Sequence, residues 1–243
     1  MKKLSRKGKM IEEMIDSKYL NEQMKLLIYL PEAFSPMNEF HLCIMQDGDD
    51  YYQLGRVATF SDRLHDDADI EDTVFVGIHY KDKYDRRRKY HPSGEEQEAY
   101  IQFLANEVIE KLDQVLPNQQ LISRALMGDS LAGTLALITA IKYPNLFSKV
   151  IMQSPYVDEV VMSSVKQATQ LHTLDIYHTI GALETNVQTL VESDVDFLTP
   201  NRKLKEFLEE NGGTYTYKEI PEGKHTWKYW QQDMPHALRT MFE

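Results

Sequence analysis

The stretch "ALMGDSLAGTLAL", residues 125–137, places Ser130 among small residues, between an apolar run and a segment rich in Leu and Ala. In an open parallel sheet, side chains that meet a ligand lie where a strand ends and turns into the next helix. A nucleophile on such a sharp turn needs small neighbours, and Gly128 and Ala132 meet that need. The alternative interpretation is that Ser130 only caps the helix, a role that serine often has.

The pentapeptide around Ser130 resembles the G-x-S-x-G signature, with Ala132 in the fifth position and Gly133 one place later. A methyl group in that position still permits close packing, so the departure is mild. The first amide groups of a helix that begins at the serine would point unpaired toward the site. They would supply half of an oxyanion hole.

Strand and helix patterns alternate on both sides of this turn. Short apolar runs predict strands at 25–31, 40–48, 73–80, 120–128, 148–155, 173–181 and 214–223. Helical spacing of apolar residues predicts helices at 95–117, ended before Pro117, at 130–144, and at 201–213, capped by Gly212. The alternation predicts an α/β fold with a mostly parallel central sheet and helices on both faces.

The N-terminal segment 8–31 lacks a helical stripe and is expected to form an antiparallel hairpin at the sheet edge. The chain has 243 residues, no internal repeat and no low-complexity linker. A single domain over residues 1–243 is therefore expected.

Composition limits the classes of partner. The net charge of −11 opposes binding to nucleic acid or to anionic membranes, and no apolar run is long enough to span a bilayer. The basic N-terminus resembles the start of a signal peptide, but acidic residues at 12 and 13 interrupt the apolar segment that export requires. The single cysteine, Cys43, cannot form an internal disulfide, which fits a reducing compartment. The expected location is the cytoplasm, and the sequence leaves open whether the chain forms a homodimer.

An acid and a histidine follow the serine in the order that α/β-hydrolases use. Glu184 follows the predicted strand at 173–181, and His225 follows the one at 214–223. The imidazole would take the proton of Ser130, and the carboxylate would orient the imidazole. Asp194 and Asp196 remain competing acids. Of the other histidines, only His79 and His178 also lie near strand ends.

No metal or cofactor is expected, because the sequence has no H-E-x-x-H motif, no paired cysteines and no calcium-binding loop. The acidic segment "DGDD" at 47–50 follows an early strand, where α/β-hydrolases place the second oxyanion donor. On spacing alone, an acidic surface turn is the favoured interpretation of this segment. The basic run "KYDRRRK" at 83–89 is, on composition alone, a solvated loop.

Four segments together resemble the family of esterases within the α/β-hydrolase fold that includes the enterochelin esterases and S-formylglutathione hydrolase (esterase D). They run in the family's order across nearly the whole chain: "IMQDGDDYY" (44–52), "GIHYKDKYDRRRKYHP" (77–92), "MGDSLAG" (127–133) and "IPEGKHTWKYW" (220–230). The serine segment alone is shared by many hydrolases, whereas its combination with the D-G-x-D-Y and G-x-H-x-W segments is much narrower.

The resemblance implies an α/β-hydrolase fold and a serine esterase that works without a cofactor on a small-molecule ester. It implies Ser130 as nucleophile, His225 as base, Glu184 as acid, and the backbone amides of Leu131 and of Gly48 or Asp49 as oxyanion donors. Of these assignments, the resemblance supports that of Glu184 as the acid least, because members of the family place the acid at different positions. Alternatives are an acyltransferase on the same scaffold, in which an alcohol replaces water, and a binding protein without catalysis.

In the family, the arginine-rich segment lies in a loop near the pocket rim. The resemblance therefore implies that Arg86, Arg87 or Arg88 binds an anionic or catecholate substrate, and leaves open which of them points inward. Trp227 and Trp230 could line the pocket or pack beneath His225, and packing is favoured for Trp230. The natural ester is not fixed by the sequence.

Overall fold

The computed structural model describes residues 6–32, 34–116 and 120–243. Its centre is an eight-stranded sheet in the order β1-β2-β4-β3-β5-β6-β7-β8. The strands are β1 (Lys9–Ser17), β2 (Glu22–Leu30), β3 (Phe40–Gln46), β4 (Thr73–Ile78), β5 (Leu121–Asp129), β6 (Lys149–Gln153), β7 (Asp175–Gly181) and β8 (Tyr215–Ile220).

Only the first two pairings of the sheet are antiparallel. Strand β1 pairs with β2 and β2 with β4 in antiparallel register, and every pairing from β4 to β8 is parallel. The predicted N-terminal hairpin and the mostly parallel α/β sheet are confirmed. Strands β3, β4 and β6 are almost entirely buried, and β5 is buried from Ala125 onward, as expected for parallel strands covered on both faces.

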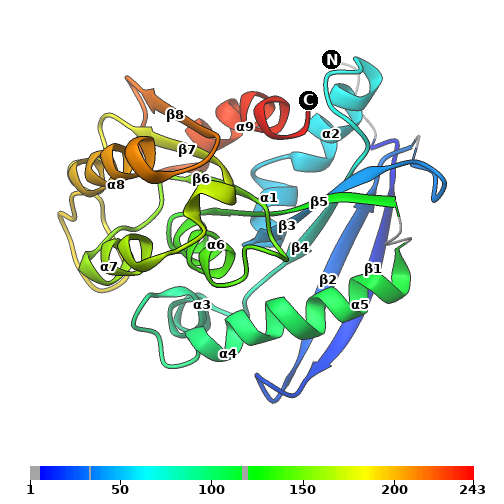
Figure 1. The fold of residues 1–243 in the computed structure, drawn as a ribbon, viewed down its shortest axis with the longest axis horizontal. Coiled ribbons are helices and arrows are strands. Elements are labelled where there is room, and N and C mark those ends of the chain that lie inside the picture. The colour runs from blue at the N-terminus through cyan, green and yellow to red at the C-terminus, as the bar shows by residue number, and fades with distance from the viewer. Residues whose placement is uncertain (1–5, 33, 117–119) are drawn as a thin grey trace.

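Helices cover both faces of the sheet (Figure 1). They are α1 (Gly48–Gln53), α2 (Val57–Asp66), α3 (Lys83–Tyr90), α4 (Gln97–Gln102), the π-helical turn η1 (Phe103–Val108), α5 (Ile109–Val115), α6 (Leu131–Lys142), α7 (Glu159–Gln167), the short 3-10 turn η3 (Leu171–Thr173), α8 (Leu198–Asn211) and α9 (Trp227–Phe242).

Each face has its own buried apolar cluster. One face packs against α4, η1, α5, α6 and α8, and contains side chains such as Leu104, Leu135 and Leu204. The other face packs against α1, α2 and α9, with Tyr51, Leu64 and Leu238. Burial of such side chains is the main stabilisation of a fold of this kind.

Two helical regions differ from the sequence-based predictions. The basic run at 83–89, predicted as a loop, forms α3, because Asp82 caps it by accepting hydrogen bonds from the backbone N–H groups of Tyr84 and Asp85. The helix predicted at 95–117 forms as α4, η1 and α5, and its predicted stop at Pro117 lies outside the described residues.

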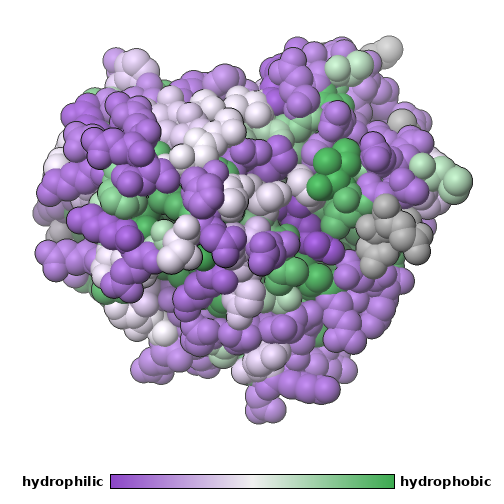
Figure 2. All heavy atoms as spheres, viewed as in Figure 1, coloured by the Kyte–Doolittle hydropathy of each residue, from purple (hydrophilic) through white to green (hydrophobic). Residues whose placement is uncertain are grey.

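The described part of the chain contains no helix that is both long and apolar enough to cross a membrane. On the face seen in Figure 2, hydrophilic residues predominate and hydrophobic ones form small separate patches.

Candidate active site

Ser130 lies at the tight turn between β5 and α6. Its backbone has φ 51° and ψ −123°, a conformation that costs a non-glycine residue energy. Hydrogen bonds hold the turn: Ser130 N–H donates to the Gln153 carbonyl at 2.9 Å, and the Ser130 carbonyl accepts from the Thr134 N–H at 3.2 Å. The turn therefore presents the serine side chain at the carboxyl edge of the sheet.

The small residues around Ser130 are required by close backbone packing. A Cβ atom at Gly128 would lie 2.2 Å from the Ala132 carbonyl carbon, well inside the contact distance of two carbon atoms. Ala132 is fully buried. The methyl group that departs from the G-x-S-x-G signature is therefore accommodated without opening the turn.

The structure brings Ser130, His225 and Glu184 into one hydrogen-bonded chain. His225 Nε2 lies 3.1 Å from Ser130 Oγ, and His225 Nδ1 lies 2.7 Å from Glu184 Oε2. Because an ionised carboxylate can only accept, Nδ1 carries a proton and Nε2 is free to accept the serine proton. A hydroxyl, an imidazole and a carboxylate joined in this way have a geometry that is suited to acyl transfer.

The loops that carry the acid and the histidine are joined to each other. After β7, the Ala182 N–H donates to the carbonyl of Ile220, the last residue of β8, at 2.9 Å, and the Leu183 N–H donates to the Gly223 carbonyl at 3.0 Å. His225 is also held between two aromatic rings, with centroid distances of 4.4 Å to Phe197 and 5.0 Å to Trp230. Contacts with Phe197, Trp230 and Glu184 thus hold the imidazole of His225 in place.

Glu184 is 1% exposed and receives two further hydrogen bonds on Oε1. The Gly181 N–H donates at 2.8 Å and the Ser154 hydroxyl at 2.7 Å. Ser154 in turn accepts from the indole N–H of Trp230 at 2.9 Å. These donors compensate for the burial of a charged carboxylate, which would otherwise be costly.

The competing acids lie elsewhere. Asp194 is exposed, and Asp196 accepts a hydrogen bond from the Thr199 N–H at the start of α8, whereas the carboxylate bonded to His225 is that of Glu184. Of the two alternative histidines, His79 stacks on Tyr80, and His178 is buried between Tyr215 and Asn201. Burial lowers the pKa of His178 to about 4.

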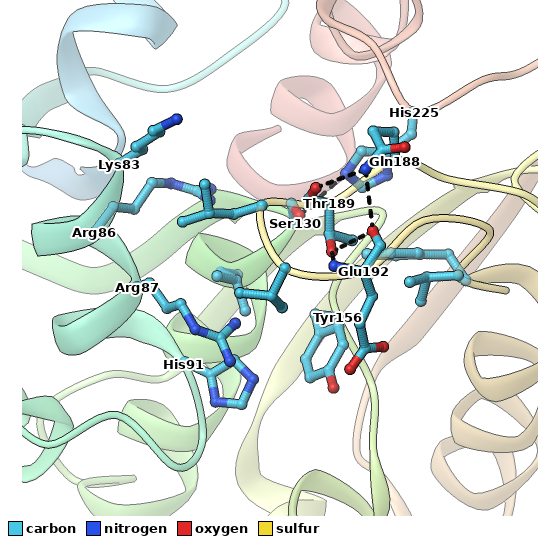
Figure 3. A pocket seen from close by; sticks show the side chains of 15 residues that line it. Lys83, Arg86, Arg87, His91, Ser130, Tyr156, Gln188, Thr189, Glu192 and His225 are labelled. Atoms are coloured by element: carbon cyan, nitrogen blue, oxygen red, sulfur yellow. Dashed lines mark hydrogen bonds between the residues drawn. The ribbon is translucent and has the colours of Figure 1, made fainter.

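Ser130 and His225 line a cavity of about 360 Å³. Figure 3 shows Lys83, Arg86, Arg87 and His91 on one side of it, with Tyr156 and Glu192 across from Arg87. The loop between β7 and α8 supplies the opposite wall: Gln188, Thr189, Leu190, Val191, Glu192, Val195 and Phe197. The cavity therefore has a cationic wall and a partly apolar wall.

The three arginines of α3 differ in their surroundings. Arg87 lines the cavity, and in the ranges 6–32, 34–116 and 120–243 no ion pair involves it or Lys83. Arg86 also lines the cavity, but its guanidinium binds Asp47. Arg88 pairs with Asp85 and Glu96 and does not line the cavity, so of the three arginines the structure brings Arg86 and Arg87 to the pocket.

Trp227 is likewise outside the cavity. It packs edge-on against Tyr51 and Trp230, with ring centroids 4.9 and 5.3 Å away, so the structure does not bring it to the pocket wall. Leu131 lines the cavity, whereas Gly48 and Asp49 begin α1 and do not. Arg86, which touches both the cavity and Asp47, connects α1 to the site.

The sequence alone did not indicate that Lys83, His91, Tyr156 and Ser154 contribute to the site. Residues 83, 87 and 91 are spaced as one face of a helix, a signal that is visible only once the basic run is recognised as helical. Tyr156 and Ser154 follow β6 (Lys149–Gln153), at the same sheet edge as Ser130. Burial and then the charge of Arg87 lower the pKa of His91, so its imidazole is neutral at pH 7.

Comparisons with known proteins agree with this architecture. A profile of the family described as "Putative esterase" matches residues 17–241. A relative in Bacillus subtilis (strain 168), "Uncharacterized protein YjcH", is 43% identical over 235 residues, which are 96% of this chain and 98% of that protein.

Three solved structures share the fold at low identity. The enterobactin esterase FES from Shigella flexneri is 17% identical with a TM-score of 0.74, over 95% of this chain and 58% of that one. An IroE-like serine hydrolase from Shewanella oneidensis is 17% identical with a TM-score of 0.76, over 95% and 80%. The BES protein from Bacillus cereus is 16% identical with a TM-score of 0.75, over 100% and 97%. The chain thus spans little more than half of the Shigella esterase.

Proposed function

The chain belongs to the "Putative esterase" family of carboxylic ester hydrolases, and from this premise we propose that it hydrolyses its ester through an acyl-enzyme on Ser130. The observation that carries the proposal is the hydrogen-bonded chain from Ser130 through His225 to the buried Glu184, at the edge of a cavity. A binding protein without catalysis would have no need for Ser130, His225 and Glu184 to be aligned in this way.

In the proposed mechanism, His225 Nε2 takes the Ser130 proton as Oγ attacks the ester carbonyl. The tetrahedral oxyanion accepts hydrogen bonds from the backbone N–H of Leu131 and from the N–H of Gly48 or Asp49. Collapse of the intermediate expels the alcohol, which receives the proton from His225. Water, activated by the same imidazole, then releases the acid and regenerates Ser130.

The cationic wall supports a substrate that carries a negative charge beside its ester. Arg87 and Lys83 face the cavity without an ion-pair partner in the described residues, although the protein as a whole has a net charge of −11. A carboxylate or other anion on the acyl or the alcohol part would bind between them by charge-assisted hydrogen bonds. The apolar side chains of Leu190, Val191 and Val195 would contact the uncharged remainder.

Hydrolysis of aryl esters of increasing acyl length tests the proposal. We expect the wild-type protein to release aryl alcohol in a burst equal to the enzyme concentration when deacylation is slower than acylation. Ser130→Ala and His225→Ala should each lose several orders of magnitude in turnover, because members of a triad act as a unit. Full turnover by folded Ser130→Ala would overturn the proposal, and acyl transfer to an added alcohol in preference to water would favour the acyltransferase.

A further inference from the structure

Arg86, in the middle of α3, binds two segments that flank the proposed oxyanion hole. Its Nε donates to both carboxylate oxygens of Asp47 at 2.9 Å, and its Nη2 donates to the Asp129 backbone carbonyl at 3.2 Å. Figure 3 shows the side chain extending from α3 toward the Ser130 turn. One guanidinium therefore connects α3, the β3–α1 junction and the β5–α6 junction.

Each segment bound by Arg86 leads directly into a proposed oxyanion donor. Asp47 precedes Gly48, and Asp129 precedes Ser130 and Leu131. Both junctions contain a non-glycine residue in the left-handed region, Asp47 at φ 57° and Ser130 at φ 51°. Such conformations persist only where surrounding contacts enforce them, and Arg86 contacts both places.

The β3–α1 junction is held from its other side by backbone packing. A Cβ atom at Gly48 would lie 2.4 Å from the Gly77 Cα of β4, so the two chains touch without side chains between them. Gly77 fixes the junction against the sheet, and Arg86 fixes it against the Ser130 turn. Together they leave the Gly48 amide little freedom to move relative to the nucleophile.

The charge of Arg86 is already compensated within the protein. Its side chain is 18% exposed and paired with Asp47, and the Asp129 carboxyl group, whose pKa burial raises, lies 4.0 Å from Nη2. Burial opposes the charged form, but the neighbouring Asp47 outweighs that effect and raises the pKa of Arg86. A guanidinium between two buried carboxyl groups offers a substrate anion little net attraction, in contrast to Arg87.

We propose that Arg86 is a positioning residue that holds the two halves of the oxyanion hole in register, and not a substrate anchor. The inference rests on the proposed function, because it assumes that the amides at residues 48 or 49 and 131 act on one oxyanion. A misplacement of about 1 Å at a reacting centre lowers a rate on the order of 100-fold. Loss of Arg86 should therefore lower kcat and leave KM unchanged.

The test compares Arg86→Gln, Arg87→Gln and Arg88→Gln on a neutral and an anionic aryl ester of the same leaving group, with rates per active site counted by burst titration. We expect Arg86→Gln to lower kcat on the order of 100-fold on both esters, with KM within about twofold. Arg88→Gln is the matched control and should equal wild type. Asp47→Asn should lower kcat similarly, and the double variant Asp47→Asn/Arg86→Gln should be no worse than the single ones.

A rise in KM confined to the anionic ester, with kcat intact, would make Arg86 a substrate contact and overturn the proposal. A wild-type kcat for Arg86→Gln would also overturn it. The same holds if burst titration counts fewer active sites in Arg86→Gln while each counted site keeps the wild-type kcat. If Arg86→Gln does not fold, Arg86→Lys, which keeps the charge but not the forked geometry, must show the same selective loss of kcat. Failure of the esterase proposal itself would appear separately, as turnover by Ser130→Ala.

Discussion

The Ser154 hydroxyl donates a hydrogen bond to Glu184 Oε1 at 2.7 Å, while the opposite oxygen of the same carboxylate faces His225. Ser154 also accepts the indole N–H of Trp230 and has φ 49°, so a second strained serine supports the site one strand away from Ser130. The proposed acid is thus held by contacts that never touch the cavity.

Removal of the Ser154 hydroxyl should slow catalysis without weakening substrate binding. We expect Ser154→Ala to lower kcat on the order of 10-fold with KM unchanged, because a hydrogen bond to a charged group contributes about 1.5 to 3 kcal/mol. Ser154→Gly, which also lacks the hydroxyl but relieves the positive φ, is the matched control. Steady-state kinetics with an aryl ester would show equal losses for both, and recovery in the glycine variant would instead implicate backbone strain.

Replacement of Glu184 by glutamine should abolish most activity. The amide would offer its NH2 group or its oxygen to Nδ1 without the charge that stabilises the imidazolium, and such a change in a triad costs on the order of 10⁴-fold in kcat. Asp194→Asn is the control, since Asp194 is exposed and should have no effect. Near-normal turnover by Glu184→Gln would remove Glu184 from the proposed triad.

Arg87 should decide between charged and neutral esters. We expect Arg87→Gln to raise KM about 10-fold for an aryl ester with a carboxylate, through loss of roughly 1.4 kcal/mol of ion pairing, and to leave the neutral analogue unaffected. Addition of salt should weaken wild-type binding of the anionic ester in the same direction. Equal effects on both esters would show that Arg87 shapes the cavity and does not select charge.

The buried His178 should make the free energy of unfolding depend on pH, independently of catalysis. Burial lowers its pKa from the ordinary 6.5 to about 4, so between these values the unfolded chain binds a proton that the folded chain does not. Stability is therefore complete above about pH 6.5 and falls as the pH drops toward 4, by roughly 3 kcal/mol at most.

Urea unfolding at pH 7 and pH 4.5 measures this loss. We expect His178→Gln to lose less stability between the two pH values than wild type does, whatever its absolute stability. His172→Gln, at an exposed site, should keep the wild-type difference. An undiminished difference in His178→Gln would show that other groups account for acid destabilisation.

The alternation of apolar strands and periodic helices was sufficient to predict the sheet, its N-terminal hairpin and the fold class. Ser130, Glu184 and His225 could be chosen because each follows a strand pattern in a chain order that this fold uses. Helix α3 could not be predicted, because five of its eight residues are basic and its mean hydropathy resembles that of a solvated loop. Its helical state depends on the Asp82 cap and on burial of Lys89 against Glu22 and Asp85.

Other parts of the site depend on tertiary contacts that leave no local pattern. In the sequence, Ser154 is an ordinary serine at a strand end. Its role depends on a hydrogen bond from the indole N–H of Trp230, which lies far along the chain. The resemblance placed the segments of Trp227 and Arg88 near the pocket and left their side-chain directions open, and in the structure both side chains pack outside the cavity. A segment can thus be placed near a site by sequence while the residue that faces the site remains undetermined.

The most direct test of the central claim is labelling with a fluorophosphonate, followed by peptide mass spectrometry, at pH 7.5. We predict one adduct per chain, on Ser130, with a labelling rate that falls at least 100-fold in His225→Gln and is abolished in Ser130→Ala. Folded wild-type protein that stays unlabelled, or that is labelled at another residue with Ser130 intact, would contradict the account.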